Sequence, residues 1–306
     1  MKYSPLDSKL LETIADLHGI PQGAFNIRKD GEGFRQSSAN IEIIPKKDKP
    51  GIDIVVKPGT KDESVHIPVI LTKSGLKDLV YNTFIIGEDA DVTIIAGCGI
   101  HNSGEDVSEH DGIHEFFVKS GARLKYIERH YGQGDGTGRR VLNPTTIVTV
   151  ENGAYVEMEM VQIKGVDNTV RNTDAFIHDR GALKIIERLL THGEQEAVSN
   201  VTLNLLGLDA SGQVLSRTVA QDNSNQLFKA ALVGKNRCSG HVECDSIIMG
   251  AAQIRAIPGL TAESAEAVLT HEAAIGRIAG DQLIKLMTLG LDEQEAIDTI
   301  LAAFLR

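Results

Sequence analysis

The sequence predicts a mainly β protein: a parallel β-helix (β-solenoid) core with short helical segments at its N-terminal and C-terminal ends. A phrase recurs along the chain in which a Gly-Ala pair lies between two strand-like stretches, and the pairs begin at Gly121, Gly153 and Gly181. The spacings of 32 and 28 residues fall within the period of about 20–50 residues that is typical of stacked coils. No helix of about 10–15 residues is apparent between these stretches, which argues against a doubly wound α/β fold.

Strand-like stretches with a period of two fill the central part of the chain, and they begin at Ile52, Asp91, His114, Thr146 and Ala182. A β-sandwich is the alternative fold that such stretches leave open. The solenoid is favoured because the hairpins of a sandwich do not require a phrase that recurs every 28–32 residues. Parallel ladders between successive phrases would distinguish the two folds.

Helical patterns are confined to the two ends of the chain. At the front, Ser4 can cap a helix that Gly19 is expected to stop. At the back, one short helix follows Asp281, and a second opens at Asp292 after a break at Gly290. We expect three parts: an N-terminal helical segment over residues 1–39, a β-helix core over residues 40–275 and a C-terminal helical pair over residues 276–306.

Composition argues against binding to nucleic acid or to membranes. The 306 residues carry a net charge of −11, whereas nucleic acid and anionic membrane surfaces bind clustered Lys and Arg. No apolar run approaches the ~20 residues of a membrane span, and the start of the chain lacks the apolar h-region of a signal peptide. Three widely spaced cysteines do not form a disulfide framework. We expect a cytoplasmic protein with reduced thiols.

Two cysteines and a histidine occur within seven residues, at Cys238, His241 and Cys244, which could indicate a metal knuckle. Strand alternation opposes that interpretation, because it places Cys244 with Cys238 on one side and His241 with Asp245 on the other. The side that carries the thiols would be buried. On the residues alone, Cys244 is therefore either a small buried hydrophobe or one ligand of a metal.

The pair His271–Glu272 is a second candidate. It does not form the HExxH zinc motif, because residue 275 is isoleucine. The pair begins 27 residues after Cys244, and residues one period apart in a solenoid lie on neighbouring coils about 4.8 Å apart. Thiolate, imidazole and carboxylate are the side chains that hold iron or zinc. A solvated polar pair is the alternative interpretation.

A third group consists of Cys98, His101, His110 and His114, four possible ligands within 17 residues. Their spacings match no standard zinc finger, so histidines in a solvated loop are favoured over a zinc site.

Motifs of the common enzyme classes are missing. No GxxxxGK[ST] phosphate loop occurs, so we expect no ATP hydrolysis by this chain, and no GxSxG elbow is present. The glycine-rich stretch 132–138 is interpreted as a flexible connector. A carbohydrate-active β-solenoid enzyme is an alternative, but it needs paired carboxylates at one level of the coils, and the acidic residues here are dispersed.

Several segments together resemble the SufB/SufD family, the scaffold proteins of the SUF iron–sulfur cluster assembly system. They are the ending DQLIKLMTLGLDEQEA, the Cys-Asp pair at Cys244, and the segment from Thr270 to Ile275. The resemblance covers roughly residues 80–306. SufB proteins carry both the cysteine and the glutamate of these segments, whereas SufD proteins keep only the histidine. The sequence therefore resembles SufB proteins more than SufD proteins.

The resemblance implies that Cys244, Glu272 and His271 hold the iron–sulfur cluster while it is built. Stable clusters usually have four thiolate ligands, and a mixed set should release its cluster more readily. The cluster would be transient, so the purified protein need not contain one.

The resemblance also implies a sulfur route. Cys98, in the phrase AGCGIHN, would be the cysteine that accepts sulfur, and His114 is a secondary candidate because it falls where SufB has a Leu-His ahead of a strand. The family's Gln-Asn-Trp segment, which helps line the route, aligns with Glu128-Arg129-His130, so the lining of the route is altered here.

The implied partners are a SufC-like ABC ATPase, docked on the helices after Gly280, and a sulfur donor protein. The chain is shorter than a typical bacterial SufB, which implies a minimal form that pairs with itself. We therefore expect a homodimer joined through the C-terminal coils, because an open coil edge must be capped or paired. A structural SufD-like subunit without a cluster site of its own is the alternative.

Overall fold

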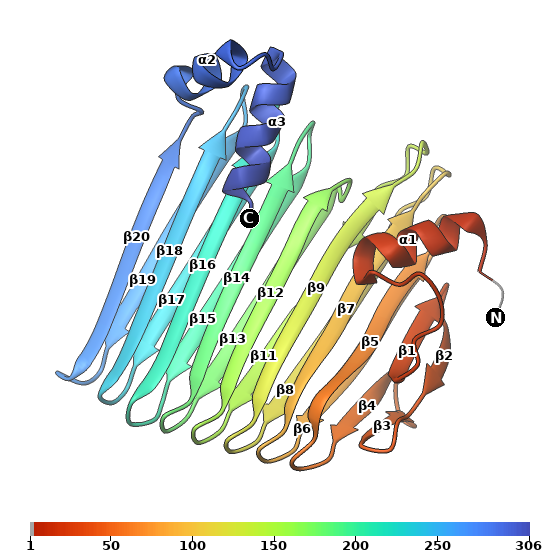
Figure 1. Cartoon of the computed structure of the whole chain (residues 1–306), viewed down its shortest axis with the longest axis vertical. Coiled ribbons are helices and arrows are strands. Elements are labelled where there is room, and N and C mark those ends of the chain that lie inside the picture. The colour runs from red at the N-terminus through yellow and green to blue at the C-terminus, as the bar shows by residue number, and fades with distance from the viewer. Residues whose placement is uncertain (1–2) are drawn as a thin grey trace.

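The computed structural model, which describes residues 3–306, is a parallel β-solenoid with helices at its two ends (Figure 1). Two ten-stranded sheets face each other, and the chain alternates between them. The first sheet contains, in spatial order, β2 (Glu32–Gln36), β1 (Ala24–Lys29), β5 (Lys61–Leu71), β7 (Asp91–His101), β9 (Arg123–Gln133), β12 (Tyr155–Lys164), β14 (Ala182–Thr191), β16 (Ala210–Ala220), β18 (Cys238–Ile248) and β20 (Ala267–Gly276).

The second sheet contains β19 (Gln253–Ala262), β17 (Asn225–Gly234), β15 (Glu196–Leu205), β13 (Asn168–Ile177), β10 (Arg140–Leu142), β8 (Ser108–Val118), β6 (Lys77–Ile86), β4 (Gly51–Val56) and β3 (Ile41–Pro45), with β11 (Thr145–Val150) beside β10 between β8 and β13. Within residues 3–306 only the first coil has antiparallel pairs, β1 with β2 and β3 with β4. All other ladders are parallel. The predicted solenoid is confirmed and the β-sandwich is excluded.

The recurring phrase sets this stacking. Arg123, which follows the first Gly-Ala pair, lies opposite Tyr155 after the second pair, and Tyr155 lies opposite Ala182, the alanine of the third pair. Gly121 and Gly153 have φ angles of 70° and 66°, a left-handed conformation that glycine adopts without strain. Every second side chain of a strand faces the interior, where aliphatic residues such as Ile185 and Val214 are buried.

Helix α1 (Pro5–Ala15) covers the outer face of the sheet at β7. The Ser4 hydroxyl accepts from Asp7 N and the Asp7 carboxylate accepts from Ser4 N, which forms a capping box. A Cβ atom at Gly97 would lie 2.6 Å from the carbonyl oxygen of Ile14, so glycine permits this close packing. The helix ends at Ala15 with Asp16 in the left-handed region, before the expected stop at Gly19.

The expectation of a helical segment over residues 1–39 needs correction, because helix accounts for only part of it. Residues 24–36 form the β1–β2 hairpin, and β1 pairs in parallel with β5. The turn residue Asp30 adopts a left-handed conformation before Gly31; an Asp-Gly pair between alternating residues is a hairpin signal. The solenoid therefore begins well before residue 40.

At the other end, α2 (Gly280–Thr288) and α3 (Glu293–Phe304) form the expected helical pair. Gly290 separates them with a φ angle of 100°. Asp292 caps α3 by accepting from Glu295 N at 2.8 Å. Helix α2 lies near the end of β20, and α3 runs back over the sheet (Figure 1). The carbonyl oxygen of Arg306 accepts from Arg188 on β14, and α1 lies near the N-terminal end of the solenoid (Figure 1).

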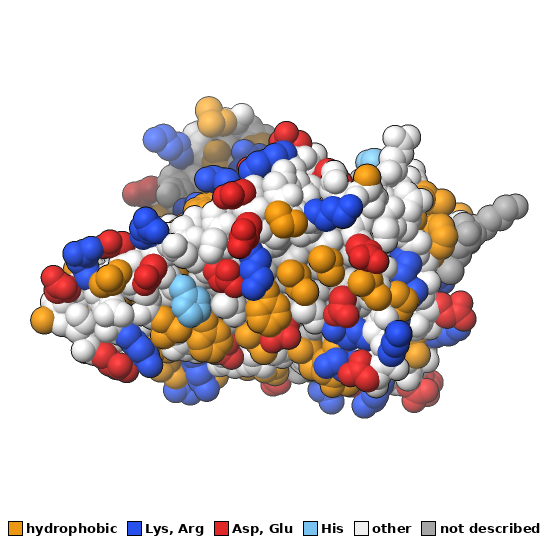
Figure 2. Space-filling model, turned by 90° about the horizontal axis from the view of Figure 1, so that it is seen from below, with side chains coloured by type: hydrophobic (Ala, Val, Ile, Leu, Met, Phe, Trp, Pro, Cys, Tyr) orange, Lys and Arg blue, Asp and Glu red, His pale blue; other side chains and the backbone are white. Residues whose placement is uncertain are grey.

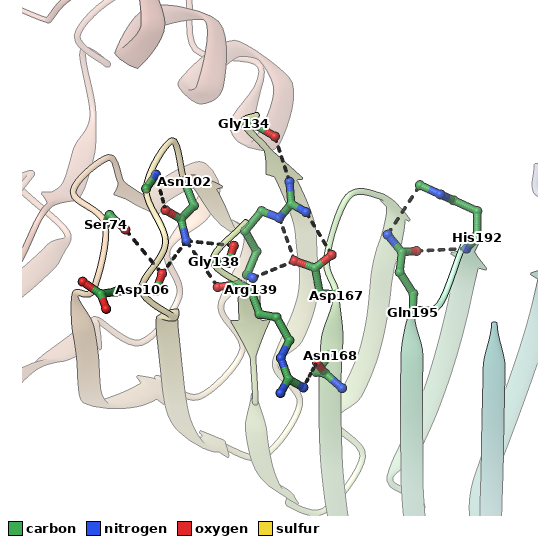
Figure 3. Close-up of polar contacts among 12 residues, drawn as sticks. Ser74, Asn102, Asp106, Gly134, Gly138, Arg139, Asp167, Asn168, His192 and Gln195 are labelled. Carbon is green, nitrogen blue, oxygen red and sulfur yellow. Dashed lines mark hydrogen bonds and ion pairs between the residues drawn. The ribbon is translucent and has the colours of Figure 1, made fainter. Parts of the chain in front are cut away.

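Residues 132–138, interpreted above as a flexible connector, pack tightly against the loop over residues 102–106. Figure 3 shows Asn102 Nδ2 donating to the carbonyl oxygens of Asp106 and Gly138, at 2.8 and 3.0 Å. A Cβ atom at Gly136 would lie 2.2 Å from the carbonyl oxygen of Gly104. The flexible interpretation is wrong, because these glycines serve close approach of two backbones.

Candidate functional site

The cysteine and the histidine of the predicted cluster site lie together at the C-terminal end of the solenoid. In the ladder between β18 and β20, Cys244 is opposite Ala273 and His271 is opposite Val242. Both side chains therefore face the interior, and Cys244 Sγ lies 3.4 Å from His271 Nε2. A thiol and an imidazole at this distance form half of a ligand set suited to iron or zinc.

Burial controls the protonation of this pair. Burial, with a smaller contribution from Asp245, raises the pKa of the Cys244 thiol. Burial, with a contribution from His241, lowers the pKa of His271. The pair is thus a neutral thiol beside a neutral imidazole near pH 7. A metal ion that binds Cys244 must displace the thiol proton, and the imidazole is ready to coordinate.

Glu272 lies on the other side of the same strand. It is opposite Glu243 in the ladder and is exposed, because consecutive residues of a strand point to opposite faces. Within residues 3–306 of one chain, no group of three or more Cys, His, Asp or Glu side chains is arranged to hold a metal ion. The fold brings together two of the three predicted ligands and separates Glu272 from them.

Cys98 is buried inside the solenoid on β7. The residue is 2% exposed, and burial, followed by the charges of Asp78 and Glu128, raises the pKa of its thiol well above the ordinary value. A cavity of about 20 Å³ lies beside it, lined also by His110, His114 and His130. This cavity has room for about one water molecule.

His114, the secondary candidate, is fixed by hydrogen bonds. Its Nδ1 lies 2.9 Å from Tyr126 Oη and its Nε2 lies 3.3 Å from Asn82 Nδ2. Burial lowers the pKa of His114 to about 4, so its imidazole is neutral near pH 7. The alternative zinc site with Cys98, His101 and His110 gains no support from the described residues, and His110 instead lies 3.1 Å from the Asp78 carboxylate.

The segment Glu128-Arg129-His130 contributes two side chains to the interior. Arg129 points outward and donates to Asp16 at 2.8 Å, whereas Glu128 and His130 are buried. Glu128 forms a buried ion pair with Arg171 on the opposite sheet. Burial opposes ionisation, but His130 and Arg171 together lower the pKa of Glu128 well below its ordinary value.

Arg171 and Glu187 are functional candidates that the sequence analysis missed. Both are buried, and Arg171 Nε lies 3.7 Å from Glu187 Oε1. A signal was present in the sequence: residue 171 alternates in step with Ala175 and Ile177, which are buried core positions. A charged residue at such an inward position is exceptional and indicates a specific role.

These side chains belong to two interior columns that run along the first sheet. Cys98 and Cys244 are separated by five strand spacings, about 24 Å at about 4.8 Å each. One column consists of Ala96, Glu128, Met160, Glu187, Ser216 and Cys244, and the other of Cys98, His130, Gln162, Leu189, Thr218 and Ser246. Two further cavities of about 10 Å³ each follow the columns towards Cys244. Polar side chains and small separate cavities therefore occur along the interior between the two thiols.

The end coil, formed by β19 and β20, is the last of the stack, and within residues 3–306 no further strand pairs with its outer edge. Leu260 on β19 lies opposite the buried Leu232 and so faces inward, yet it is 45% exposed. On the described part of α2 no residue is buried, and Ile284 is 60% exposed. Strand β19 and helix α2, which carry these residues, lie at the same end of the solenoid as β18 and β20 (Figure 1).

The face seen from below carries acidic and basic side chains interspersed with hydrophobic ones (Figure 2). Such a mixed face does not provide the clustered Lys and Arg that nucleic acid requires. Among residues 3–306, no helix is both long enough and apolar enough to cross a membrane.

A model of the SufBD core domain of the SUF system for Fe–S cluster assembly matches residues 70–304. The chain belongs to the SufB/SufD family. The match begins ten residues before the region of resemblance expected from the sequence and ends two residues before the last residue. It includes Cys98, Cys244 and the two C-terminal helices.

Curated relatives agree with this membership of the SufB/SufD family. A SufBD family protein of Archaeoglobus fulgidus is 30% identical over 285 residues, which cover 91% of this chain and 73% of the relative. One from Methanocaldococcus jannaschii is 29% identical over 250 residues, or 81% of this chain and 78% of the relative. One from Methanothermobacter thermautotrophicus is 26% identical over 262 residues, which cover 83% of this chain but only 62% of the relative. All three are described as iron–sulfur cluster assembly proteins.

Proposed function

We propose that this SufB/SufD-family protein is a SufB-like scaffold on which an iron–sulfur cluster is built at the end coil and then released. The observation that carries the proposal is the contact of 3.4 Å between Cys244 Sγ and His271 Nε2, at the end of a polar interior that leads from a second buried thiol. The chain itself provides ligands and a route and hydrolyses no ATP. All three cysteines are free, as a protein of the reducing cytoplasm requires.

Glu272 is the third ligand of the proposal. Its carboxylate lies on the outer face of β20, which pairs on one side only, with β18. A β-bulge places two consecutive residues of one strand opposite a single residue of the partner strand. A bulge at His271 and Glu272 would let Glu272 join Cys244 while His271 stays in place, and we expect it on docking of a second protein.

Sulfur would enter at Cys98 and travel through the interior to Cys244. No other cysteine lies in the two columns, and Cys238, the third cysteine of the chain, is near the start of β18. Persulfide exchange needs thiols in contact, so sulfur would cross the ~24 Å as hydrogen sulfide. Its release would break the S–S bond of the Cys98 persulfide with two electrons from a thiol reductant, which becomes a disulfide. The polar columns and their cavities support such a passage.

The two thiols can be tested separately by changing how sulfur is supplied. With free sulfide and ferrous iron, Cys98→Ser is expected to form clusters like the parent, because free sulfide reaches the end coil directly. With sulfur supplied only by a persulfide-carrying donor protein, Cys98→Ser is expected to lose cluster formation, measured as visible absorbance. A Cys98→Ser variant that works equally well with both sources would contradict the route, and a parent that forms no cluster with either would favour the structural SufD-like alternative.

A homodimer through the end coils is part of the proposal. Leu260 faces an interior that continues into solvent, and a second coil would bury it. Leu260→Lys is expected to convert a dimer into a monomer in sedimentation at micromolar concentration, because an inward-pointing charge blocks pairing at an edge. Ile257→Lys is the matched control: the residue is on the same strand and 42% exposed, but it faces outward. A parent that sediments only as monomer would contradict the dimer.

The partner ATPase would dock on α2 and α3. The exposed residues Ile284, Met287 and Leu289 form an apolar surface on and just after α2, which suits a helix that lies in a groove of a second protein. Deletion of residues 281–306 is expected to abolish co-purification with a SufC-like ATPase, and Ile284→Asp is expected to weaken it. The matched control is Lys285→Asp on the same helix. Retention of the ATPase after the deletion would contradict this assignment.

A further inference from the structure

Two buried carboxylates share one buried cation in the interior between the sheets. Glu128, Arg171 and Glu187 are 2%, 4% and 4% exposed. Arg171 forms an ion pair with Glu128, whereas its Nε stays 3.7 Å from Glu187 Oε1, beyond hydrogen-bond distance. A buried charge without a full counter-charge is costly. The group therefore carries an excess negative charge that one proton on Glu187 would neutralise.

Burial also increases the affinity of Glu187 for a proton. It raises the pKa of this carboxyl above the ordinary value, although Arg171, Ser199 and Ser216 oppose the shift. Ser199 Oγ and Ser216 Oγ both donate to Glu187 Oε2, at 3.1 and 3.4 Å. Glu187 is thus held by hydrogen bonds when it is ionised and is relieved of its charge when it is protonated. Both properties suit a proton acceptor.

Ser216 lies between Glu187 and the thiol of the end coil. Glu187, Ser216 and Cys244 occupy successive positions of one interior column, on β14, β16 and β18, and neighbouring strands are about 4.8 Å apart. All three side chains line the same small cavity. A serine hydroxyl can accept one hydrogen bond while it donates another, so Ser216 can pass a proton from one neighbour to the other.

Cys244 needs such an acceptor when a metal ion binds. Burial raises the pKa of its thiol, and the thiol must lose its proton to become a ligand. Cys244 is only 3% exposed, so direct transfer of the proton to solvent is hindered. His271 Nε2 is the nitrogen 3.4 Å from Sγ. In the proposed function this atom binds the iron, so it cannot keep the proton.

We propose that Glu187 accepts, through Ser216, the proton that Cys244 loses when iron binds. The S–H bond of Cys244 breaks as the Fe–S bond forms. Ser216 Oγ takes up that proton and passes its own to Glu187 Oε2, and no electrons are transferred. The inference rests on the proposed function, because it requires a metal ion at Cys244. Glu187 and Ser216 handle the proton only, and neither binds the iron.

Infrared difference spectroscopy tests where the proton goes. Cobalt(II), added anaerobically in place of ferrous iron, is the probe, because its thiolate complex has a charge-transfer absorbance. When cobalt binds, we expect the parent to gain the carbonyl-stretch band of a protonated carboxyl group. Glu187→Gln should lack this band, and Glu157→Gln, on the outer face of β12, should keep it. A parent that binds cobalt without the band, or a band that persists in Glu187→Gln, overturns the inference.

Two serine variants test the relay with little change to the core. Ser216→Ala and Ser199→Ala each remove one hydroxyl that donates to Glu187, but only Ser216 lies in the column with Cys244. In stopped-flow measurements, Ser216→Ala is expected to slow the appearance of the cobalt–thiolate absorbance about 100-fold, a typical contribution of a positioned proton transfer. Ser199→Ala is expected to match the parent. Equal rates in both variants would mean that Ser216 is only structural and would overturn the relay.

The pH dependence of the binding rate is a second test. The ionisable groups that face Glu187 are Arg171 from the opposite sheet, Glu128 from β9 and Cys244 from β18. Arg171 stays charged, and the pKa of Glu128 lies well below its ordinary value. The parent rate should therefore fall as the pH drops through the raised pKa of Glu187, because a protonated carboxyl accepts no proton. Glu187→Gln should lose this inflection, and an unchanged profile would overturn the relay.

Cys244→Ser separates this inference from the proposed function. If its cobalt–thiolate absorbance is lost while Ser216→Ala binds cobalt at the parent rate, the metal site stands and the relay is overturned. If the absorbance survives in Cys244→Ser, the proposed cluster site fails and the relay fails with it.

Discussion

Cys244→Ser is expected to abolish the visible absorbance of an iron–sulfur cluster after anaerobic reconstitution with ferrous iron and sulfide. The Cys244 thiol is the one cysteine side chain in contact with His271 among the described residues, and a serine hydroxyl is a poor ligand for this iron. The fold should remain intact, because the change replaces a single buried sulfur. Far-ultraviolet circular dichroism of the variant should match that of the parent.

Cys238→Ser is the matched control for this loss. Cys238 lies on the same strand, faces the same interior and is equally buried, but it is six residues away from the His271 contact. We expect it to reconstitute like the parent. Equal losses in the two variants would mean that serine disturbs β18 rather than the cluster, and equal retention would place the site elsewhere, first at Cys98 and His114.

Glu272→Ala tests the rearrangement of the edge strand. If Glu272 becomes a ligand, the variant should reconstitute with much lower yield than the parent, although its side chain is exposed in the single chain. Full reconstitution of Glu272→Ala beside failure of Cys244→Ser would reduce the ligand set of this chain to Cys244 and His271.

Arg171→Met is expected to destabilise the protein by about 3–5 kcal/mol, because it leaves the Glu128 carboxylate buried without its counter-charge. Urea denaturation followed by circular dichroism would measure the loss. The double variant Glu128→Gln with Arg171→Met removes both charges and is expected to recover most of the stability. A single variant that loses less than about 1 kcal/mol, the range of an exposed pair, would contradict a buried ion pair between these residues.

The solenoid could be predicted because the residues of its turns recur with the period of its coils. Gly-Ala pairs recur at turns in which Gly121, Gly153 and, before the third pair, Arg180 adopt a left-handed conformation, and each turn stacks beside the next. The two terminal helices were predictable from caps such as Ser4 and Asp292. The β1–β2 hairpin was missed because it occupies a non-repeating coil, where the period of the phrase gives no information.

The candidate site was only partly predictable. The period of 27 residues correctly brought the strand of His271 beside Cys244, but spacing by itself does not decide register, and a difference of one residue places Glu272 on the outer face. In the group of Glu128, Arg171 and Glu187, Arg171 contacts residues that lie 43 positions before it and 16 positions after it in the sequence, on the opposite sheet. No local pattern in the sequence indicates such a contact. The inward position of Arg171 was its only signal.

Coordination of the cluster by His271 is the central claim, and hyperfine spectroscopy tests it most directly. Protein that carries ¹⁵N-labelled histidine would be reconstituted and reduced, and pulsed electron paramagnetic resonance would then detect nitrogen bound to the cluster. We expect a ¹⁵N coupling in the parent that disappears in His271→Ala and persists in His241→Ala, because the His241 side chain lies on the outer face of β18. A parent without histidine coupling, or a coupling that survives in His271→Ala, would contradict it.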